Sequence, residues 1–218
     1  MLLWVGGNAL LFLSLQYTIA INAAVINSIE PLLIVLFAWL LFRDPFSVGQ
    51  GIGLLISLGG VIVLIAAGSL ERLLNLDFNQ GDLIVTGAYI SWSLYAVILR
   101  KVPSNVDHRA IAVVILGLGA LFLAPIYFLE TLFYRPVRLN GISVITILIV
   151  ALIASAIPMI LWNYSIMRLG PARAGQFLHL IPAFTVVMAI AVLDETLGMY
   201  HITGIVLIAL GLIIAARR

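Results

Sequence analysis

The most constraining feature of this sequence is a series of eight long apolar segments, joined by short connections that hold most of the charged residues. A bilayer core about 30 Å thick is spanned by about 20 apolar residues in an α-helix, which satisfies its own backbone hydrogen bonds there. The pattern therefore predicts an all-α polytopic membrane protein with eight transmembrane helices. The predicted spans are approximately Met1–Thr18, Ala23–Phe42, Val48–Ala67, Gly81–Leu99, Ala110–Leu129, Ile142–Met167, Ala172–Leu193 and Met199–Ala216.

Composition agrees with a membrane protein and excludes several other classes. Hydrophobic residues make up 64% of the 218 residues and charged residues only 9%, against about 45–50% and about 25% in soluble domains. Without cysteine, the chain has no disulfides, thiolate metal ligands or cysteine nucleophile. It also contains neither an HExxH motif nor a GxxxxGK[ST] loop. We therefore expect no metal, no other cofactor and no nucleic-acid partner.

The distribution of arginine and lysine predicts the orientation in the membrane. Three basic residues fall on one predicted side, and they are Arg72, Arg135 and Arg138. The other eight fall on the opposite side, and they are Arg43, Arg100, Lys101, Arg109, Arg168, Arg173, Arg217 and Arg218. By the positive-inside rule, the second side is cytoplasmic, and both chain ends face the cytoplasm of a cell-membrane protein.

The two halves of the chain align with each other at an offset of 151 residues. The matched pairs are Ser14 with Ser165, Ala23 with Ala174, Pro31 with Pro182, Val35 with Val186, Ala38 with Ala189, Asp44 with Glu195, Gly53 with Gly204 and Gly60 with Gly211. The predicted orientation places Asp44 and Glu195 on opposite sides of the membrane. This pattern predicts an inverted repeat, the architecture of many secondary transporters.

The second copy contains five spans and the first only three, so the alignment favours a ten-helix, 5+5 inverted-repeat fold that lacks its first two helices. Residues 1–67 are then the last three helices of the first repeat, and residues 81–218 are the complete second repeat. Residues 68–80 form a connector outside the cytoplasm, predicted to lie at the membrane interface because of its leucines.

Several motifs resemble the EamA family of the drug/metabolite transporter superfamily. Leu15-Gln16-Tyr17-Thr18 through Ser28-Ile29-Glu30-Pro31-Leu32 is similar to the end of that family's third helix and the start of its fourth. The second copy gives Met167-Arg168-Leu169-Gly170-Pro171-Ala172-Arg173-Ala174, then Pro182 and Asp194-Glu195. Gly81-Asp82-Leu83 with Ser91-Trp92-Ser93-Leu94-Tyr95 is similar to the sixth helix. The resemblance implies a permease or exporter of amino acids, metabolites or small amphipathic compounds.

Glu30 is the first candidate for the substrate or ion pathway. It is a carboxylate well inside a predicted span, directly before Pro31, which frees a backbone carbonyl and predicts a kink. Glu30 is either a proton or substrate-amine site or a carboxylate bonded to a neighbouring helix near the interface. Asn27, three residues earlier, is expected to share its helix face.

Further polar residues are candidates for the same pathway. Gln176 and His179 repeat the three-residue spacing of Asn27 and Glu30, and His179 is either a proton-coupling group or an interhelical hydrogen-bonding residue. Asn163 follows a second predicted kink at Pro158, and a third is expected at Pro182. Trp92, Tyr95 and Asn8 complete the set, with bundle packing as the alternative role for the two aromatic residues.

Small residues at four-residue spacing predict close helix packing. Gly49, Gly53 and Ser57 form one such series, and Gly204 and Gly211 lie on the last helix. These faces serve either packing within the chain or a homodimer.

The function predicted from the sequence is a secondary transporter rather than an enzyme. It would move a small-molecule substrate across the lipid bilayer by alternating access, with proton coupling left open. An intramembrane enzyme is disfavoured because the sequence lacks paired catalytic groups within one repeat. The remaining alternative is a non-transporting or partner-dependent membrane subunit, including a lipid-carrier flippase component.

Overall fold

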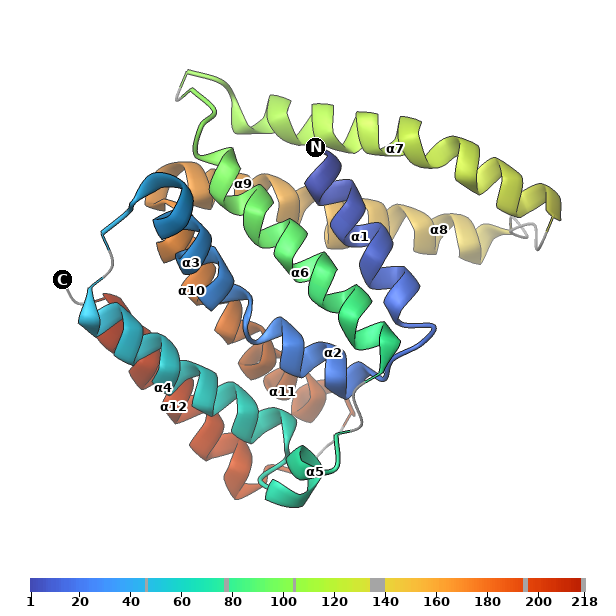
Figure 1. Cartoon of the computed structure of the whole chain (residues 1–218). Helices are drawn as coiled ribbons and strands as arrows, with labels where there is room; N and C mark the ends of the chain where they lie inside the picture. The colour runs from blue at the N-terminus through green and yellow to red at the C-terminus, as the bar shows by residue number, and fades with distance from the viewer. Residues whose placement is uncertain (46, 77–78, 104, 134–139, 194–195, 217–218) are drawn as a thin grey trace.

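The computed structural model describes residues 1–45, 47–76, 79–103, 105–133, 140–193 and 196–216. These residues form helices joined by short turns, without strands (Figure 1). Within the described residues, seven helical segments are long and apolar enough to cross a membrane, and an eighth apolar helix is shorter. The prediction of an all-α polytopic membrane protein is confirmed.

The first half of the chain contains four helices and a short connector helix. They are α1 (Leu2–Ser14), α2 (Ala20–Asn27), α3 (Glu30–Phe42), α4 (Val48–Ile65) and α5 (Leu70–Leu74). Together, α2 and α3 make one apolar span, Asn22–Phe42, that is broken at Ser28 and Ile29. Helix α5 lies within the predicted connector at residues 68–80.

The second half contains five apolar spans. Helices α6 (Gln80–Leu99), α7 (His108–Phe133) and α12 (Met199–Ala216) are each continuous. The span Gly141–Leu169 consists of α8 (Gly141–Ile149), the π-helix η1 (Val150–Ala156) and α9 (Ile157–Leu169). The span Pro171–Val192 consists of α10 (Pro171–Gln176), the 3₁₀ turn η2 (Phe177–His179) and α11 (Leu180–Leu193).

The first helix is shorter than the sequence predicted. Helix α1 ends at Ser14 rather than at Thr18, and its 13 residues rise about 20 Å. The chain then turns through Leu15–Thr18, and the Thr18 hydroxyl bonds to Asp82 at the start of α6. That tertiary bond accounts for Thr18 lying outside the helix.

Helices α4 and α12 form the most extensive helix pair and cross antiparallel (Figure 1). A Cβ added to Gly53 would lie 2.5 Å from the carbonyl oxygen of Gly211, and one on Gly60 would lie 2.7 Å from that of Gly204. The two backbones therefore touch where a side chain would not fit. These glycines pack within the chain, whereas a Cβ on Gly49 would meet only ordinary contacts.

The main core gathers around α6. Helix α6 contacts α1, α2, α3 and α9, and its buried Tyr95–Val97 stretch packs with Ile34 of α3 and Met159 of α9. By contrast, α8 has no buried residue, and it extends away from the rest of the bundle (Figure 1).

Candidate functional site

Two spans are broken at matching positions, which brings irregular backbone into the interior. The α2–α3 span breaks at Ser28 and Ile29, and the α10–α11 span becomes a 3₁₀ turn at Phe177–His179. Pro31 lies in the first turn of α3, and Pro182 is the third residue of α11. Proline lacks a backbone N–H, so it suits the start of a new helix directly after a break.

His179 connects the two breaks. Its ring is 1% exposed, with Nε2 3.0 Å from the backbone oxygen of Ser28 and Nδ1 2.7 Å from the hydroxyl of Ser57 on α4. Because a carbonyl only accepts, Nε2 donates to Ser28; in the neutral ring Nδ1 then accepts from Ser57. One buried side chain thus joins three helical segments through both of its ring nitrogens.

A small cavity adjoins His179. It has a volume of about 10 Å³, and Asn27 and Ser28 line it together with His179 and Pro182. That volume is the space of about one water molecule, so the junction is closed in this conformation. Glu30 does not line this cavity.

Glu30 is a buried carboxylate at the first position of α3. It is 7% exposed, and no described residue donates a hydrogen bond to its side chain. Tyr89 of α6 lies close enough to interact with it electrostatically. A carboxylate in this setting is costly to keep charged unless a cation or a proton accompanies it.

Four aromatic rings form a cluster between α1 and α6. Trp92 lies 5.4 Å from Tyr89 and 6.2 Å from Trp4 between ring centroids, and Trp4 lies 5.2 Å from Tyr95. Gly7 makes room for Trp92, because a Cβ there would lie 2.6 Å from the indole. The cluster offers flat apolar surfaces with polar edges.

Three buried hydrogen-bond donors near this core have no partner among the described residues. They are the Trp92 indole N–H, the Asn163 amide nitrogen and the Gln176 amide nitrogen. The Asn163 carbonyl is engaged, because the Tyr95 hydroxyl donates to it at 2.6 Å. Buried donors are normally paired, so unpaired donors on α6, α9 and α10 are available to a solute or to water.

Two other predicted positions have local roles in this structure. The Asn8 side chain donates to the carbonyl of Trp4, one turn earlier in α1. Pro158 lies in the first turn of α9, directly after the π-helical stretch that interrupts this span. π-helical segments are rare in proteins, and where they occur they are frequently at functional sites. The predicted acidic pair Asp194–Glu195 lies outside the described residues.

The sequence analysis missed the role of Asp82. This carboxylate is 4% exposed and accepts bonds from the Thr18 hydroxyl at 2.5 Å, the Asn22 amide at 3.0 Å and the Asn79 N–H at 2.7 Å. The signal was present, because Asn79 and Asp82 have the spacing of a capping box at the start of α6. Asp82 ties the first half of the chain to the second.

No metal site emerges, since nowhere in the described part of the chain do three His, Asp or Glu side chains gather. The groups that lie near one another here are the four aromatic rings, the Asn163 amide, which contacts Tyr95, and the Glu30 carboxylate, which interacts with Tyr89. Such groups can bind an organic solute but offer no nucleophile paired with a base.

The chain resembles known transporters along nearly its whole length. It is 28% identical, over 97% of its length, to the uncharacterized transporter YyaM of Bacillus subtilis, and covers 69% of that protein. It is 26% identical, over 91%, to an uncharacterized transporter of Archaeoglobus fulgidus, covering 68%. It is 22% identical, over 90%, to the "Probable terminal-alkyne amino-acid exporter" of Streptantibioticus cattleyicolor, covering 64%. The chain thus spans about two thirds of the length of these relatives.

A solved crystal structure has the same fold, with a TM-score of 0.78 over 98% of this chain and 75% of its own, at 21% identity. Together with the apolar spans, these likenesses define a multi-pass α-helical membrane transporter. The sequence model of the EamA-like transporter family matches residues 2–66 and 79–217. The chain belongs to that family, as the sequence motifs had predicted.

Proposed function

We propose that this protein is a secondary transporter that moves a small organic solute by alternating access. The observation that carries the proposal is the bond between His179 and Ser28, which joins the two broken spans in the interior. Discontinuous helices that meet inside the membrane form the solute sites of many transporters. The chain offers no nucleotide-binding loop, so an ion gradient or the solute gradient supplies the driving force.

An inverted repeat is the second part of the proposal. His179 and Ser28 are 151 positions apart, which is the offset of the sequence alignment. Gly53 of α4 contacts Gly211 of α12, and Gly60 contacts Gly204. The alignment matches Gly53 with Gly204 and Gly60 with Gly211. Interchanging the two halves therefore turns one contact into the other. An antiparallel crossing of matched helices with this exchange is what a two-fold axis in the membrane plane requires. These contacts support inverted halves that rock against each other.

The solute chemistry follows from the groups left without partners. Unpaired donors at Trp92, Asn163 and Gln176 suit an acceptor such as a carboxylate, and Glu30 suits an ammonium group or a proton. The aromatic cluster suits an apolar side chain. An amino acid or a similar amphipathic metabolite combines these features, and one relative is named for amino-acid export.

Transport into proteoliposomes tests the proposal. The full chain is reconstituted, and uptake of a mixed set of radiolabelled neutral amino acids is followed with and without an imposed pH gradient. Saturable uptake above protein-free vesicles supports a transporter, and dependence on the gradient supports proton coupling. Absence of uptake by the chain alone, with the protein folded, would favour a partner-dependent subunit instead.

A further inference from the structure

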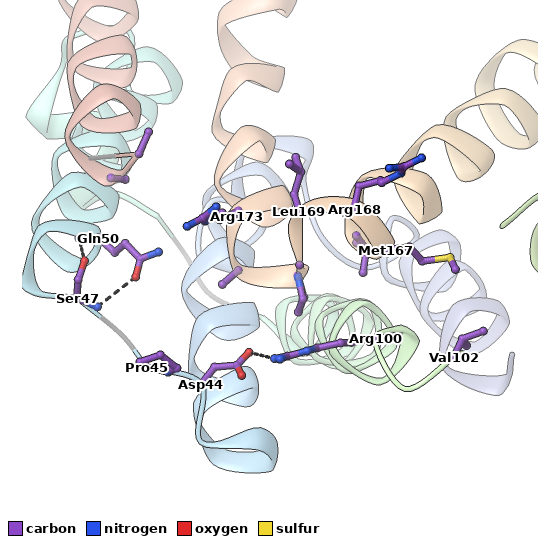
Figure 2. A pocket seen from close by; sticks show the side chains of 16 residues that line it. Asp44, Pro45, Ser47, Gln50, Arg100, Val102, Met167, Arg168, Leu169 and Arg173 are labelled. Atoms are coloured by element: carbon purple, nitrogen blue, oxygen red, sulfur yellow. Dashed lines mark hydrogen bonds and ion pairs between the residues drawn. The ribbon is translucent and has the colours of Figure 1, made fainter. Parts of the chain in front are cut away.

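A large cavity opens at the arginine-rich end of the bundle, which the positive-inside rule predicts to be cytoplasmic. Its volume is about 890 Å³, and it lies between the α3–α4 loop, the end of α6, the α9–α10 junction and the end of α12 (Figure 2). Its polar lining consists of Asp44, Ser47, Gln50, Arg100, Arg168 and Arg173. A cavity of this size accommodates an organic ligand rather than a single ion.

The charged side chains that line this cavity carry a net positive charge. Among its described lining residues, three are arginines and one, Asp44, is acidic. Asp44 is already paired with Arg100, as the dashed line in Figure 2 marks. Arg168 stacks over the Tyr164 ring at 5.4 Å. Arg173 has no ion pair with any described residue and extends into the same space as Gln50 (Figure 2).

An apolar groove adjoins the cavity. It has a volume of about 490 Å³ and shares Asp44 and Pro45 with the cavity, so the two spaces meet at the α3–α4 loop. Arg43 lines its end at the α3–α4 loop, and its apolar wall along α3 consists of Leu32, Val35, Leu36 and Trp39. These residues occupy one face of the helix, and the groove runs from the arginine-rich end toward the interior of the membrane.

We propose that the cavity and the groove together bind one anionic phospholipid. Its phosphate group lies against Arg173 in the cavity, and an acyl chain lies along Leu36 and Trp39 in the groove. Guanidinium groups bind phosphate oxygens in a bidentate manner, and basic pockets between transmembrane helices bind anionic headgroups. A free phosphate would use the cavity but would gain nothing from the apolar groove, so the pairing of the two spaces favours a lipid.

Native mass spectrometry of the full chain tests this site. The protein is delipidated in detergent, incubated with phosphatidylglycerol or phosphatidylcholine vesicles, and measured for retained lipid. We expect one phosphatidylglycerol per chain, retained at least about fivefold over phosphatidylcholine. Arg173→Gln should remove that preference, and Arg173→Lys should keep part of it. Arg109→Gln is the matched control, because Arg109 lies at the same predicted end of the bundle but lines neither space.

Two further measurements distinguish a bound phospholipid from a free phosphate ion. Trp39→Ala should lower retention of phosphatidylglycerol but leave binding of inorganic phosphate unchanged. Equal retention of both lipids, or retention that survives Arg173→Gln, would overturn the proposal. Inorganic phosphate that displaces the lipid fully at equimolar concentration would also overturn it, in favour of a free-anion site. Size-exclusion chromatography confirms that each variant is folded.

Discussion

The imidazole of His179 donates from Nε2 to the backbone oxygen of Ser28 at 3.0 Å, although the two residues are 151 positions apart. The bond ties the break between α2 and α3 to the 3₁₀ turn that precedes α11. A third segment joins them, because Ser57 of α4 bonds to the other ring nitrogen. Both nitrogens are thus committed to structure, which argues for a packing role of His179 in this conformation.

This arrangement predicts that His179→Ala destabilises the protein strongly. The change leaves the Ser28 carbonyl and the Ser57 hydroxyl buried without partners, at a cost of about 2–4 kcal/mol in unfolding free energy. Ser28→Ala is the control, because it keeps the backbone carbonyl that His179 uses and loses only the local bond to Val25. Thermal unfolding in detergent measures both. Equal losses in the two variants would contradict the predicted importance of the His179 bond.

Glu30→Gln should abolish any pH dependence of transport while leaving membrane insertion intact. Glutamine keeps the size and buried position of Glu30 but cannot carry a proton. The measurement is uptake into proteoliposomes over a series of pH values. Glu130→Gln, at an exposed carboxylate of α7, should keep the pH dependence of the unmodified protein. An unchanged profile in Glu30→Gln would remove Glu30 from any coupling role.

The crossing of α4 and α12 predicts a sharp contrast between two glycines of α4. A Cβ at Gly53 would lie 2.5 Å from the Gly211 carbonyl oxygen, so Gly53→Ala must push the helices apart and should cost about 1–3 kcal/mol. Gly59 has open space at that position, and Gly59→Ala should be neutral or stabilising by up to about 1 kcal/mol. Chemical denaturation compares the two. If Gly53→Ala had the unfolding free energy of the unmodified protein, the close contact between α4 and α12 at this position would be contradicted.

Asp82→Asn should destabilise the join between the two halves. Thr18, Asn22 and the Asn79 N–H all donate to this carboxylate. Asparagine keeps one acceptor oxygen, and its NH₂ group would face these donors without accepting from them. We expect a loss of about 2–4 kcal/mol, since bonds to charged groups contribute about 1.5–3 kcal/mol each. Asp107→Asn is the control, because asparagine caps a helix as well as aspartate does. Protease sensitivity of the connector at residues 68–80 gives a second readout.

Trp92→Phe tests whether the unpaired indole N–H serves a solute. Since this donor has no partner in the described protein, its removal should leave the thermal stability nearly unchanged. The apparent affinity for a carboxylate-bearing solute should fall, by about fivefold for the loss of a hydrogen bond of about 1 kcal/mol. Unchanged affinity would place Trp92 in packing rather than in solute binding.

The sequence predicted the parts of this fold that depend on local composition. Apolar runs of sufficient length predicted the seven spans of the described residues, whereas the first predicted span forms only the shorter helix α1. The motif at Glu30-Pro31 predicted a kink, and the structure has a two-residue interruption at Ser28 and Ile29. The glycine spacing in α4 and α12 pointed to close packing, although the sequence did not choose between packing within the chain and a homodimer. The ion pair between Asp44 and Arg100 joins residues 56 positions apart, and no sequence pattern predicted it.

The remaining features depend on contacts between residues far apart in the chain. Sequence spacing placed Asn27 near Glu30, and it could not foresee that Asn27 lines the small cavity beside His179, which lies 152 positions further along the chain. Likewise, α1 ends at Ser14 because the chain beyond it turns so that Thr18 reaches Asp82, a residue 64 positions later. No local propensity encodes either partner.

The sequence by itself determined that this chain is an all-helical membrane protein, because the bilayer accepts only long apolar helices in an open chain. It also predicted interruptions near Pro31, Pro158 and Pro182, because proline acts on its own backbone. Only the tertiary structure decided which polar groups are paired and which are left open. The pairing of His179, Asp82 and Asn163, and the isolation of Glu30 and Arg173, depend on how helices from both halves pack against one another.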